Sequence, residues 1–450
     1  MKKFCFSFIL ICVFSSGFAA ESFTVGDIVY NILSDNQPRT VEVVSKTPFY
    51  AGNVIIPASV SYNNVDYQVT AIGSQAFMNC DALTSVTVPN SVLTIGDLAF
   101  AACSNLSSAT IGNSVTSFGL LSFYCCIGLT TFDFPASLLN IGEGAFSYCN
   151  GLTSVTIPNS VTSIGKEAFS YMELLTTVII PNSVLSIGEG AFSSCSKLLS
   201  VEIPNSVSQI EKSLFKDCTK LTSVVVPSSV TSIGESAFSY CSALENINLP
   251  NSITSIGEHA FNNCTSLTSI EIPNAVETIG GFGFYGCIAL KTADIGSSVR
   301  SIGEVAFSGC SQLTSITSRA VIPPTLGSMV FNGVQRTLIP LYVPAESITT
   351  YKTTPQWSDF SDVVAIIAGV ETPQERALSV FPNPVVDFLS IRNLDVGTDI
   401  CVYNAHGQVV LTEKAISELN TIDLTTMQSG MYLVKAIQQG KSNVYKVIKE

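Results

Sequence analysis

Apolar and polar residues follow one another along most of this chain in a pattern that repeats every 23 residues. The clearest copy is residues 141–163, which read IGEGAFSYCNGLTSVTIPNSVTS. The Ile-Gly pair that opens this unit returns, with substitutions and without insertion or deletion, at Ile72, Ile95, Phe118, Ile164, Ile187, Ile210, Ile233, Ile256, Ile279 and Ile302. A fixed period of this length is typical of a repeat solenoid, in which each unit stacks on its neighbours to bury its apolar side. We therefore expect eleven stacked coils over residues 72–316.

Two spacings within the unit predict two kinds of local structure. Phe146, Cys149 and Leu152 are three residues apart, which predicts a short helical or 3₁₀ segment with these side chains inward. Val155 and Ile157 then alternate with polar residues, as in a half-exposed strand, and we expect the strands of successive coils to form one parallel sheet. The proline that follows has no N–H for a sheet ladder and therefore ends the strand.

The inward positions are almost constant, as a shared core requires. Leucine recurs from Leu83 to Leu313, and phenylalanine fills its position in every unit: Phe77, Phe100, Phe123, Phe146, Phe169, Phe192, Phe215, Phe238, Phe261, Phe284 and Phe307. The glycine after the first isoleucine indicates a left-handed backbone or a close approach of the next coil. Glu211 replaces this glycine in one unit, so we expect a local adjustment of the stack there.

These motifs resemble a known family. The string Leu-x-x-Val-x-Ile fits the strand of leucine-rich repeats. The 23-residue form with Ile-Pro-x-x-Val-x-x-Ile-Gly-x-x-Ala-Phe-x-x-Cys resembles the BspA-like class of bacterial surface proteins over about residues 50 to 340. The resemblance implies a leucine-rich-repeat solenoid with a parallel sheet, and adhesion to host matrix proteins or to other cells.

The two ends of the array differ from the repeat. Residues 1–19, with Met1-Lys2-Lys3, an apolar run and small residues at Gly17 and Ala19, predict a secretory signal peptide. Residues 20–71 are expected to form an N-terminal cap and the first coil, which holds a small insertion near Tyr62-Asn63-Asn64, because an open terminal coil exposes both core and sheet edge. Residues 317–366 are expected to cap the other end, and their Tyr351 and Trp357 resemble the ends of BspA-like arrays.

A different domain is expected after a polar linker at 367–376. Residues 377–450 contain seven short alternating segments separated by turn residues, which predicts a small all-β sandwich. Its Phe381-Pro382-Asn383-Pro384, its Gly430-Met431-Tyr432-Leu433-Val434 and its terminal Lys446-Val447-Ile448-Lys449 resemble the C-terminal sorting domain of the type IX secretion system. The resemblance implies a Bacteroidetes-type export route and the outer-membrane secretion machinery as a partner of residues 377–450.

Composition narrows the choice of partners. Only 12% of the 450 residues are charged, and the net charge is −13 with no basic run. This balance argues against nucleic acid or an anionic membrane as the partner. No stretch after the signal peptide is apolar and long enough to span a bilayer, so we expect no transmembrane span in the mature chain.

Most cysteines occupy one repeat position. They are Cys80, Cys103, Cys126, Cys149, Cys195, Cys218, Cys241, Cys264, Cys287 and Cys310, with Met172 in the remaining unit. Methionine replaces a buried hydrophobic residue but neither a disulfide partner nor a thiolate ligand, which favours free thiols packed in the core. Disulfides between neighbouring coils are the alternative in an exported protein.

The chain offers little for catalysis, and we expect no enzymatic activity, cofactor or metal site. Its two histidines are His259, at a variable repeat position, and His406, in a turn of the last domain. Recurrent carboxylates follow the repeat glycine at an expected helix start, where negative charge suits the helix dipole: Asp97, Glu143, Glu189, Glu235, Glu258 and Glu304.

One row of residues varies while its neighbours repeat. It points out of the expected sheet between the inward valine and isoleucine: Thr87, Thr110, Asp133, Thr156, Ile179, Glu202, Val225, Asn248, Glu271 and Asp294. A tentative ligand surface takes Asp133 to Asp294 of this row together with Leu199. An ordinary solvated sheet face is the alternative. The sequence thus predicts an exported surface protein that binds a host or bacterial surface protein as an adhesin, and the second hypothesis is a structural or polysaccharide-binding envelope component.

Overall fold

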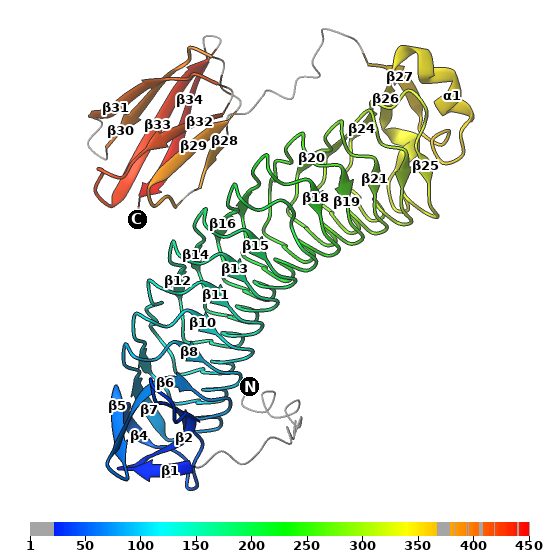
Figure 1. Ribbon diagram of the computed structural model, residues 1–450. Helices are drawn as coiled ribbons and strands as arrows, with labels where there is room; N and C mark the ends of the chain where they lie inside the picture. Colours follow the sequence, from blue (N-terminus) through cyan, green and yellow to red (C-terminus); the bar gives the residue numbers. More distant parts are fainter. Residues whose placement is uncertain are drawn as a thin grey trace.

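The computed structural model describes residues 22–366 and 379–449, apart from 383, 393, 395, 405–407, 418, 439 and 440. The expected signal peptide, the linker at 367–376 and His406 lie outside the described residues. Figure 1 shows the first region as a curved array of stacked coils. The last domain, in residues 379–449, follows as a separate β-structure.

The first strands close the N-terminal end of the core. They are β1 (Ser22–Val25), β2 (Ile28–Ser34), β3 (Thr40–Val44), β4 (Gly52–Ile55), β5 (Ser59–Tyr62) and β6 (Val65–Ile72). β1, β2 and β3 form an antiparallel meander, and β6 runs parallel to β3. The insertion expected at Tyr62 to Asn64 is the hairpin of β5 and β6, whose Asn63 and Asn64 have φ of 51° and 62°.

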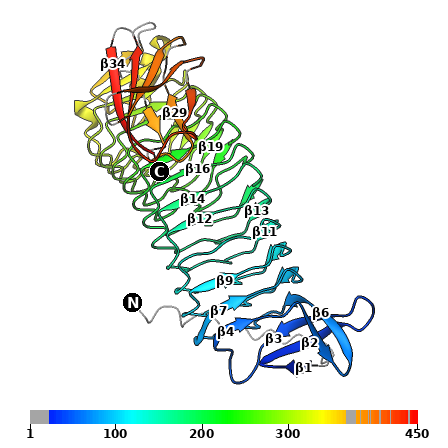
Figure 2. The ribbon, with the colours of Figure 1, turned by 90° about the vertical axis from the view of Figure 1, so that its left-hand side faces the viewer.

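Two ladders of parallel strands run along the array, where the sequence indicated one sheet. The first ladder uses the Val-x-Ile segment of most repeats: β7 (Leu83–Thr87), β9 (Ser108–Thr110), β12 (Ser154–Thr156), β14 (Thr177–Ile179), β16 (Ser200–Glu202), β17 (Ser223–Val225), β20 (Ser269–Glu271), β22 (Thr292–Ile295) and β24 (Ser315–Ser318). Paired residues are 23 apart, as in Thr156↔Ile179 and Glu202↔Val225. Figure 2 shows β7, β9, β12, β14 and β16 along one side of the array.

The second ladder is made of two-residue strands that end at the isoleucine before the repeat glycine. Its members are β8 (Thr94–Ile95), β10 (Ser117–Phe118), β11 (Asn140–Ile141), β13 (Ser163–Ile164), β15 (Ser186–Ile187), β18 (Ser232–Ile233), β19 (Ser255–Ile256), β21 (Thr278–Ile279), β23 (Ser301–Ile302) and β25 (Thr325–Leu326). Such short strands carry too little alternation to be recognised in the sequence. They give each coil a second hydrogen-bonded side.

The half coil between the ladders consists of successive tight turns rather than the expected helical segment. Two positions per coil have left-handed φ, for example Glu167 at 52° and Tyr171 at 56°. Their N–H groups donate to the next coil, at Glu189 O (2.8 Å) and Ser193 O (2.7 Å), so the hydrogen bonds run between coils and a helix cannot continue. The inward direction of the phenylalanine, cysteine and leucine is nevertheless as predicted.

A column of phenylalanine rings forms the centre of the core. All eleven predicted phenylalanines are buried, and neighbouring rings are nearly parallel, from 4.9 Å between Phe77 and Phe100 to 5.8 Å between Phe192 and Phe215. Tyr50 begins the column at 4.4 Å from Phe77, and Phe331 continues it at 5.8 Å from Phe307. Burial of one such side chain contributes roughly 1.5–3 kcal/mol, which repeats at every coil.

The cysteine ladder consists of free, buried thiols, which confirms the first interpretation of the sequence. From Cys103 onward, each ladder Sγ donates to the carbonyl oxygen of the phenylalanine 26 residues earlier, for example Cys149 to Phe123 at 3.1 Å. Burial raises the pKa of Cys195 and Cys310 to about 12. These thiols are therefore structural donors that stay protonated at neutral pH.

Close approach of the preceding coil explains the repeat glycine. A Cβ built on Gly165 would lie 2.6 Å from Glu143 N and 2.7 Å from Gly142 C, and the φ of Gly165 is not left-handed. Where Glu211 replaces the glycine, no strand pair joins β15 to the next coil within the described array, and Ile210 pairs only with Ile233. The expected local adjustment is thus present, because a side chain at this position forces the coils apart.

The C-terminal end of the array is closed by β26 (Pro340–Val343), β27 (Asp362–Ala365), the 3₁₀ helices η1 (Arg336–Leu338) and η2 (Ala345–Ser347), and the helix α1 (Ile348–Thr353). β26 and β27 extend the first ladder beyond β24. Tyr351 and Trp357 are fully buried, and the indole Nε1 donates to Pro324 O at 3.0 Å. These two aromatic side chains cover the last coil.

The last domain consists of seven antiparallel strands around its own core. They are β28 (Ser379–Phe381), β29 (Phe388–Arg392), β30 (Asp399–Tyr403), β31 (Val409–Lys414), β32 (Leu419–Asp423), β33 (Gly430–Gln438) and β34 (Lys441–Lys449). The sheets β28-β29-β32 and β31-β30-β33-β34 bury Leu389, Ile391, Val402, Ile422 and Val434. This arrangement confirms the small all-β domain that the alternation indicated.

Candidate binding surface

The variable row lies on the outward side of the first ladder, between the buried valine and isoleucine of each coil. We call this side the strand face and define it by the residues Asp133, Thr156, Ile179, Leu199, Glu202, Val225, Asn248, Glu271 and Asp294. All are exposed except the half-buried Val225 and Asp294. Asp133 and Asn248 lie in coils where no strand of the first ladder is assigned, and β14 is not paired with β16, so the ladder is interrupted at these three points of the described array.

Register brings several of these residues side by side. Thr156 pairs with Ile179, Glu202 with Val225, and Glu271 with Asp294. Neighbouring parallel strands are about 4.8 Å apart, so each pair offers a ligand two side chains at once. The strand face is therefore a stripe along the array rather than a single pocket.

The acidic end of the strand face contains a cation that the sequence did not point to. Arg319 donates from Nε to Asp294 Oδ1 at 2.8 Å and from Nη2 to Oδ2 at 2.5 Å. Asp294 and Glu271 both raise the pKa of Arg319. Asp294 is therefore engaged within the chain, which reduces its value as a free ligand group. Arg319 lies beyond the last repeat, so the repeat pattern gave no signal for it.

The middle of the strand face is apolar. The exposed fractions of Ile179 and Leu199 are 46% and 36%, and Leu174, two residues after Met172, is 39% exposed. Glu202 lies between Ile179 and Val225 in the row, and although its side chain is exposed, partial desolvation by the surrounding protein raises the pKa of its carboxyl group. Leu174 was missed because it belongs to the turn before the strand, where other units carry small or polar residues.

The cations of the array are unevenly distributed. No lysine, arginine or histidine occurs between Lys46 and Lys166, whereas Lys197 and Lys220 occupy the same repeat position in consecutive coils. Both are exposed and precede the strands β16 and β17. Within the described residues neither is within 4 Å of a carboxylate oxygen. Their recurrence at a 23-residue interval is the signal by which the sequence could have revealed them.

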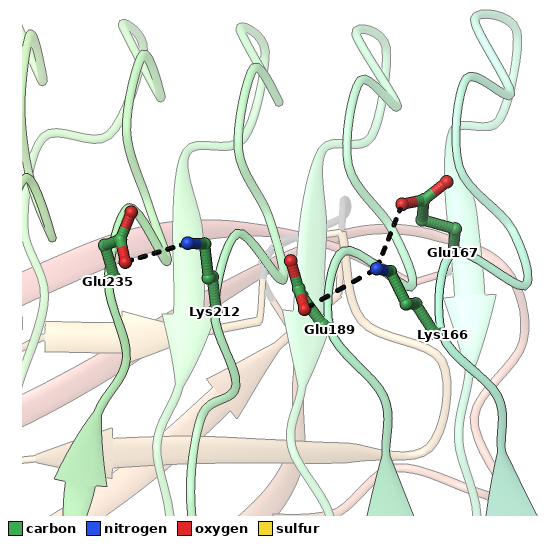
Figure 3. Close-up of polar contacts among 5 residues, drawn as sticks. All are labelled: Lys166, Glu167, Glu189, Lys212 and Glu235. Atoms are coloured by element: carbon green, nitrogen blue, oxygen red, sulfur yellow. Dashed lines mark hydrogen bonds and ion pairs between the residues drawn. The ribbon is translucent and has the colours of Figure 1, made fainter.

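Other lysines pair with carboxylates on the turn side of the array, as Figure 3 shows. Lys166 Nζ lies 3.8 Å from Glu189 and 3.9 Å from Glu167, and Lys212 Nζ lies 2.8 Å from Glu235. Glu189 and Glu235 follow the repeat glycine, but no helix begins there, so the dipole explanation of the recurrent carboxylates does not hold. These two glutamates instead form exposed ion pairs with a lysine of the preceding coil, which contribute little to stability.

The last features to consider are His259, groups of possible metal ligands and membrane-spanning helices. The ring of His259 stacks on Phe282 at 4.7 Å. In the described residues, no group of three or more His, Cys, Asp or Glu side chains is placed to hold a metal ion. The part of the chain that the structure describes also contains no helix with the length and apolarity needed to cross a membrane.

Comparison with known proteins agrees with this architecture. A family model described as "BspA type Leucine rich repeat region (6 copies)" matches residues 70–198, 119–245 and 231–352. A "Secretion system C-terminal sorting domain" model matches residues 379–450. Leucine-rich repeats joined to a sorting domain of the type IX secretion system define a protein that is secreted to the cell surface. The chain belongs to the family of proteins with BspA type leucine-rich repeats.

Individual relatives cover different parts of the chain. A leucine-rich repeat protein from Bacteroides ovatus has 30% identity and a TM-score of 0.60 over 77% of this chain and 100% of its own. A leucine rich cell surface protein from Faecalibacterium prausnitzii has 32% identity and a TM-score of 0.41 over 66% of this chain and 94% of its own. Beta-agarase A of Zobellia galactanivorans is 36% identical over 67 residues, 14% of this chain and 12% of the agarase. The chain therefore spans only about an eighth of the agarase.

Proposed function

We propose that this exported surface protein acts as an adhesin and binds a host or bacterial surface protein through its strand face. The proposal rests on the contrast between the variable outward residues of the strands and the constant buried residues beside them. Residues between the inward valine and isoleucine vary from coil to coil and are exposed or half-buried, while the buried positions on either side repeat. Core packing does not dictate side chains at these exposed positions, so a ligand is free to select them, and repeat solenoids offer such extended surfaces to partners.

A binding screen tests this proposal. The purified mature protein is presented to immobilised matrix proteins, to cell-surface polysaccharides and to whole bacteria. We expect saturable binding to one class of protein. A folded sample that binds no protein above background would refute the adhesin function.

Charge reversal then tests the surface. We expect Glu202→Lys with Glu271→Lys to weaken binding without lowering the melting temperature, since both side chains are exposed. The matched control is Glu143→Lys with Glu258→Lys, which changes the same charge on the turn side. Equal losses in both variants would indicate a nonspecific charge effect, and unchanged binding would place the site elsewhere.

A structural or glycan-binding role in the envelope is the second candidate. It is favoured by the hydroxyl-bearing residues that run beside the variable row: Ser154, Thr177, Ser200, Ser223 and Ser269. Binding to polysaccharide but to no protein in the same screen would favour this role. Neither candidate assigns a reaction to the protein, and a hydrolase activity that copurifies with it through repeated purification would contradict both.

A further inference from the structure

The strand face and the turns that precede its strands present apolar and charged side chains from three successive coils together. Leu174 and Ile179 come from one coil, Leu199 and Glu202 from the next, and Val225 from the third. We call the four apolar residues of this group, together with Lys197 and Lys220, the anchor patch. The register Glu202↔Val225 places the second and third coils side by side on this face.

The apolar part of the anchor patch differs from other exposed leucines of the array. Leu139 and Leu185, for example, lie two coils apart before the second ladder, with Thr162 at the same repeat position between them. Isolated apolar residues of this kind are normal on protein surfaces, whereas contiguous ones mark contact sites. At the repeat position of Leu199, the neighbouring coils carry Thr176 and Thr222, so the fold does not require leucine there.

Lys197 and Lys220 form the cationic part of the anchor patch, and neither has a carboxylate partner within the described residues. Lys197 and Lys220 lie one coil apart, about 4.8 Å along the ladder direction, so their like charges repel. Lys166 and Lys212, in contrast, are each paired with a glutamate of the next coil. A carboxylate placed between Lys197 and Lys220 would form charge-assisted hydrogen bonds with both and remove the repulsion.

The middle coil of the anchor patch presents these chemistries in a fixed order. Along the coil, Lys197 is followed by Leu199 and then by Glu202, so cation, apolar side chain and carboxylate follow one another. The complementary ligand carries a carboxylate, an apolar side chain and a hydrogen-bond donor in the same order. A protein segment supplies all three, whereas an acidic polysaccharide supplies the negative charge without an apolar side chain.

We propose that the anchor patch binds an extended segment of a partner protein in which an apolar side chain lies next to an aspartate or glutamate. This inference rests on the proposed function, because it names the part of the strand face that selects the partner. The apolar side chain packs on Ile179, Leu199 and Val225. Its neighbouring carboxylate binds Lys197 and Lys220.

The array itself supplies substitutions that preserve the fold. Ile179→Thr and Leu199→Thr introduce the residues found at these positions in adjacent coils, Thr156 and Thr176. Lys197→Ala and Lys220→Ala introduce the alanine that stands at Ala243. Leu139→Thr with Leu185→Thr is the matched apolar control, and Lys166→Ala with Lys212→Ala is the matched cation control.

The experiment uses the full mature chain on an array of synthetic decapeptides of random sequence, with dextran sulfate as the anionic polysaccharide probe. We expect the protein to select peptides with a large apolar residue beside an acidic one. The double threonine variant should lose about tenfold in affinity and the double alanine variant a similar factor, while both controls bind as the unsubstituted protein does.

Three results would overturn the inference. One is peptide selection without preference for acidic neighbours, and another is equal loss in the anchor and control variants. The third is binding to dextran sulfate that needs the lysines but not Leu199, since this would assign the patch to an acidic glycan. If the screen of whole proteins finds a ligand whose binding is insensitive to the anchor variants, the proposed function stands and the anchor patch is refuted. If the screen finds no protein ligand, the proposed function itself fails.

Discussion

Gly280 and Gly281 are adjacent, and the structure predicts opposite effects when each is replaced by alanine. A Cβ on Gly280 would lie 2.4 Å from Glu258 N and 2.5 Å from Gly257 C, both backbone atoms of the preceding coil. A Cβ on Gly281 would approach nothing closer than 3.4 Å, at Glu304 O. Neither glycine has a left-handed φ, so backbone strain does not separate the two substitutions.

The expected loss of stability in Gly280→Ala follows from the backbone that the new methyl group displaces. The coil has to shift away from backbone that cannot rotate aside, and overpacking of this kind costs about 1–3 kcal/mol. The shift also weakens the hydrogen bond from Gly280 N to Ile256 O, 2.8 Å long, which contributes about 1 kcal/mol. Reduced freedom of the unfolded chain returns about 0.4–1 kcal/mol, so we expect a net loss of about 2 kcal/mol. Gly281→Ala has only the last term and should be neutral or stabilise by up to about 1 kcal/mol.

Hydrogen exchange with mass spectrometry measures the effect locally, and urea denaturation measures it globally. Repeat arrays often unfold in more than one step, so the local measurement decides. We expect faster exchange in Gly280→Ala for peptides that cover residues 256–259 and 278–282, and no such change in Gly281→Ala. Equal stability of the two variants would refute the close-approach explanation of the repeat glycine.

Three further predictions concern the same array. Glu211→Gly should let its coil approach Gly188 and join the two parts of the second ladder, so exchange at Ser208 should slow; unchanged exchange would mean that the side chain is not what separates the coils. Because burial raises the pKa of the ladder thiols from Cys126 onward, the folded array keeps protons that the unfolded chain loses above about pH 8.5. Stability is therefore fully present below that pH and falls above it by up to about 1.4 kcal/mol per thiol and pH unit, and a melting temperature that stays constant from pH 8 to 10 would contradict this burial. Lys212→Ala removes only an exposed ion pair with Glu235 and should leave the urea midpoint unchanged in 0.15 M salt, whereas a clear drop would show that the pair matters more than its exposure indicates.

The sequence was sufficient for the parts of the fold in which one residue type serves one purpose at every repeat. Phenylalanine, leucine and cysteine are inward because each coil buries the same slots, and Met172 shows that the thiol position accepts a hydrophobic residue. The seven strands of the sorting domain were visible for a similar reason, since their alternation persists over several residues.

The turn half of the coil was not predictable from spacing alone. Residues three apart fit a helix as well as a series of tight turns. The left-handed positions are occupied by residues as different as Gln75, Leu98 and Val305, which give no common signal. The conformation is determined by bonds to the next coil, such as Leu98 N to Leu120 O at 2.7 Å, and these compensate the backbone strain.

The sequence was sufficient to predict which residues of the candidate surface point outward, but not the charged groups that surround them. Variation identified Ile179 and Glu202 as outward residues, and the structure places them there. Sequence variation did not reveal that Arg319 forms hydrogen bonds with the carboxylate of Asp294, because the two residues are 25 apart and Arg319 lies past the last repeat. Lys197 and Lys220 escaped notice because their position, two residues after the cysteine, lies in a turn that small or polar side chains occupy in all other units except the one with Leu174.

The hydrogen bonds from thiols to carbonyl groups between coils bear on how the number of repeats can change in evolution. Each of these bonds spans 26 residues, so every interior coil except the one with Met172 presents the same thiol donor and carbonyl acceptor to its neighbours. Loss or duplication of one whole repeat in the gene would join equivalent atoms again, whereas loss of a single codon would misalign every donor beyond it. The number of coils, and with it the length of surface offered to a partner, is therefore free to change in whole units while the stability per coil stays the same.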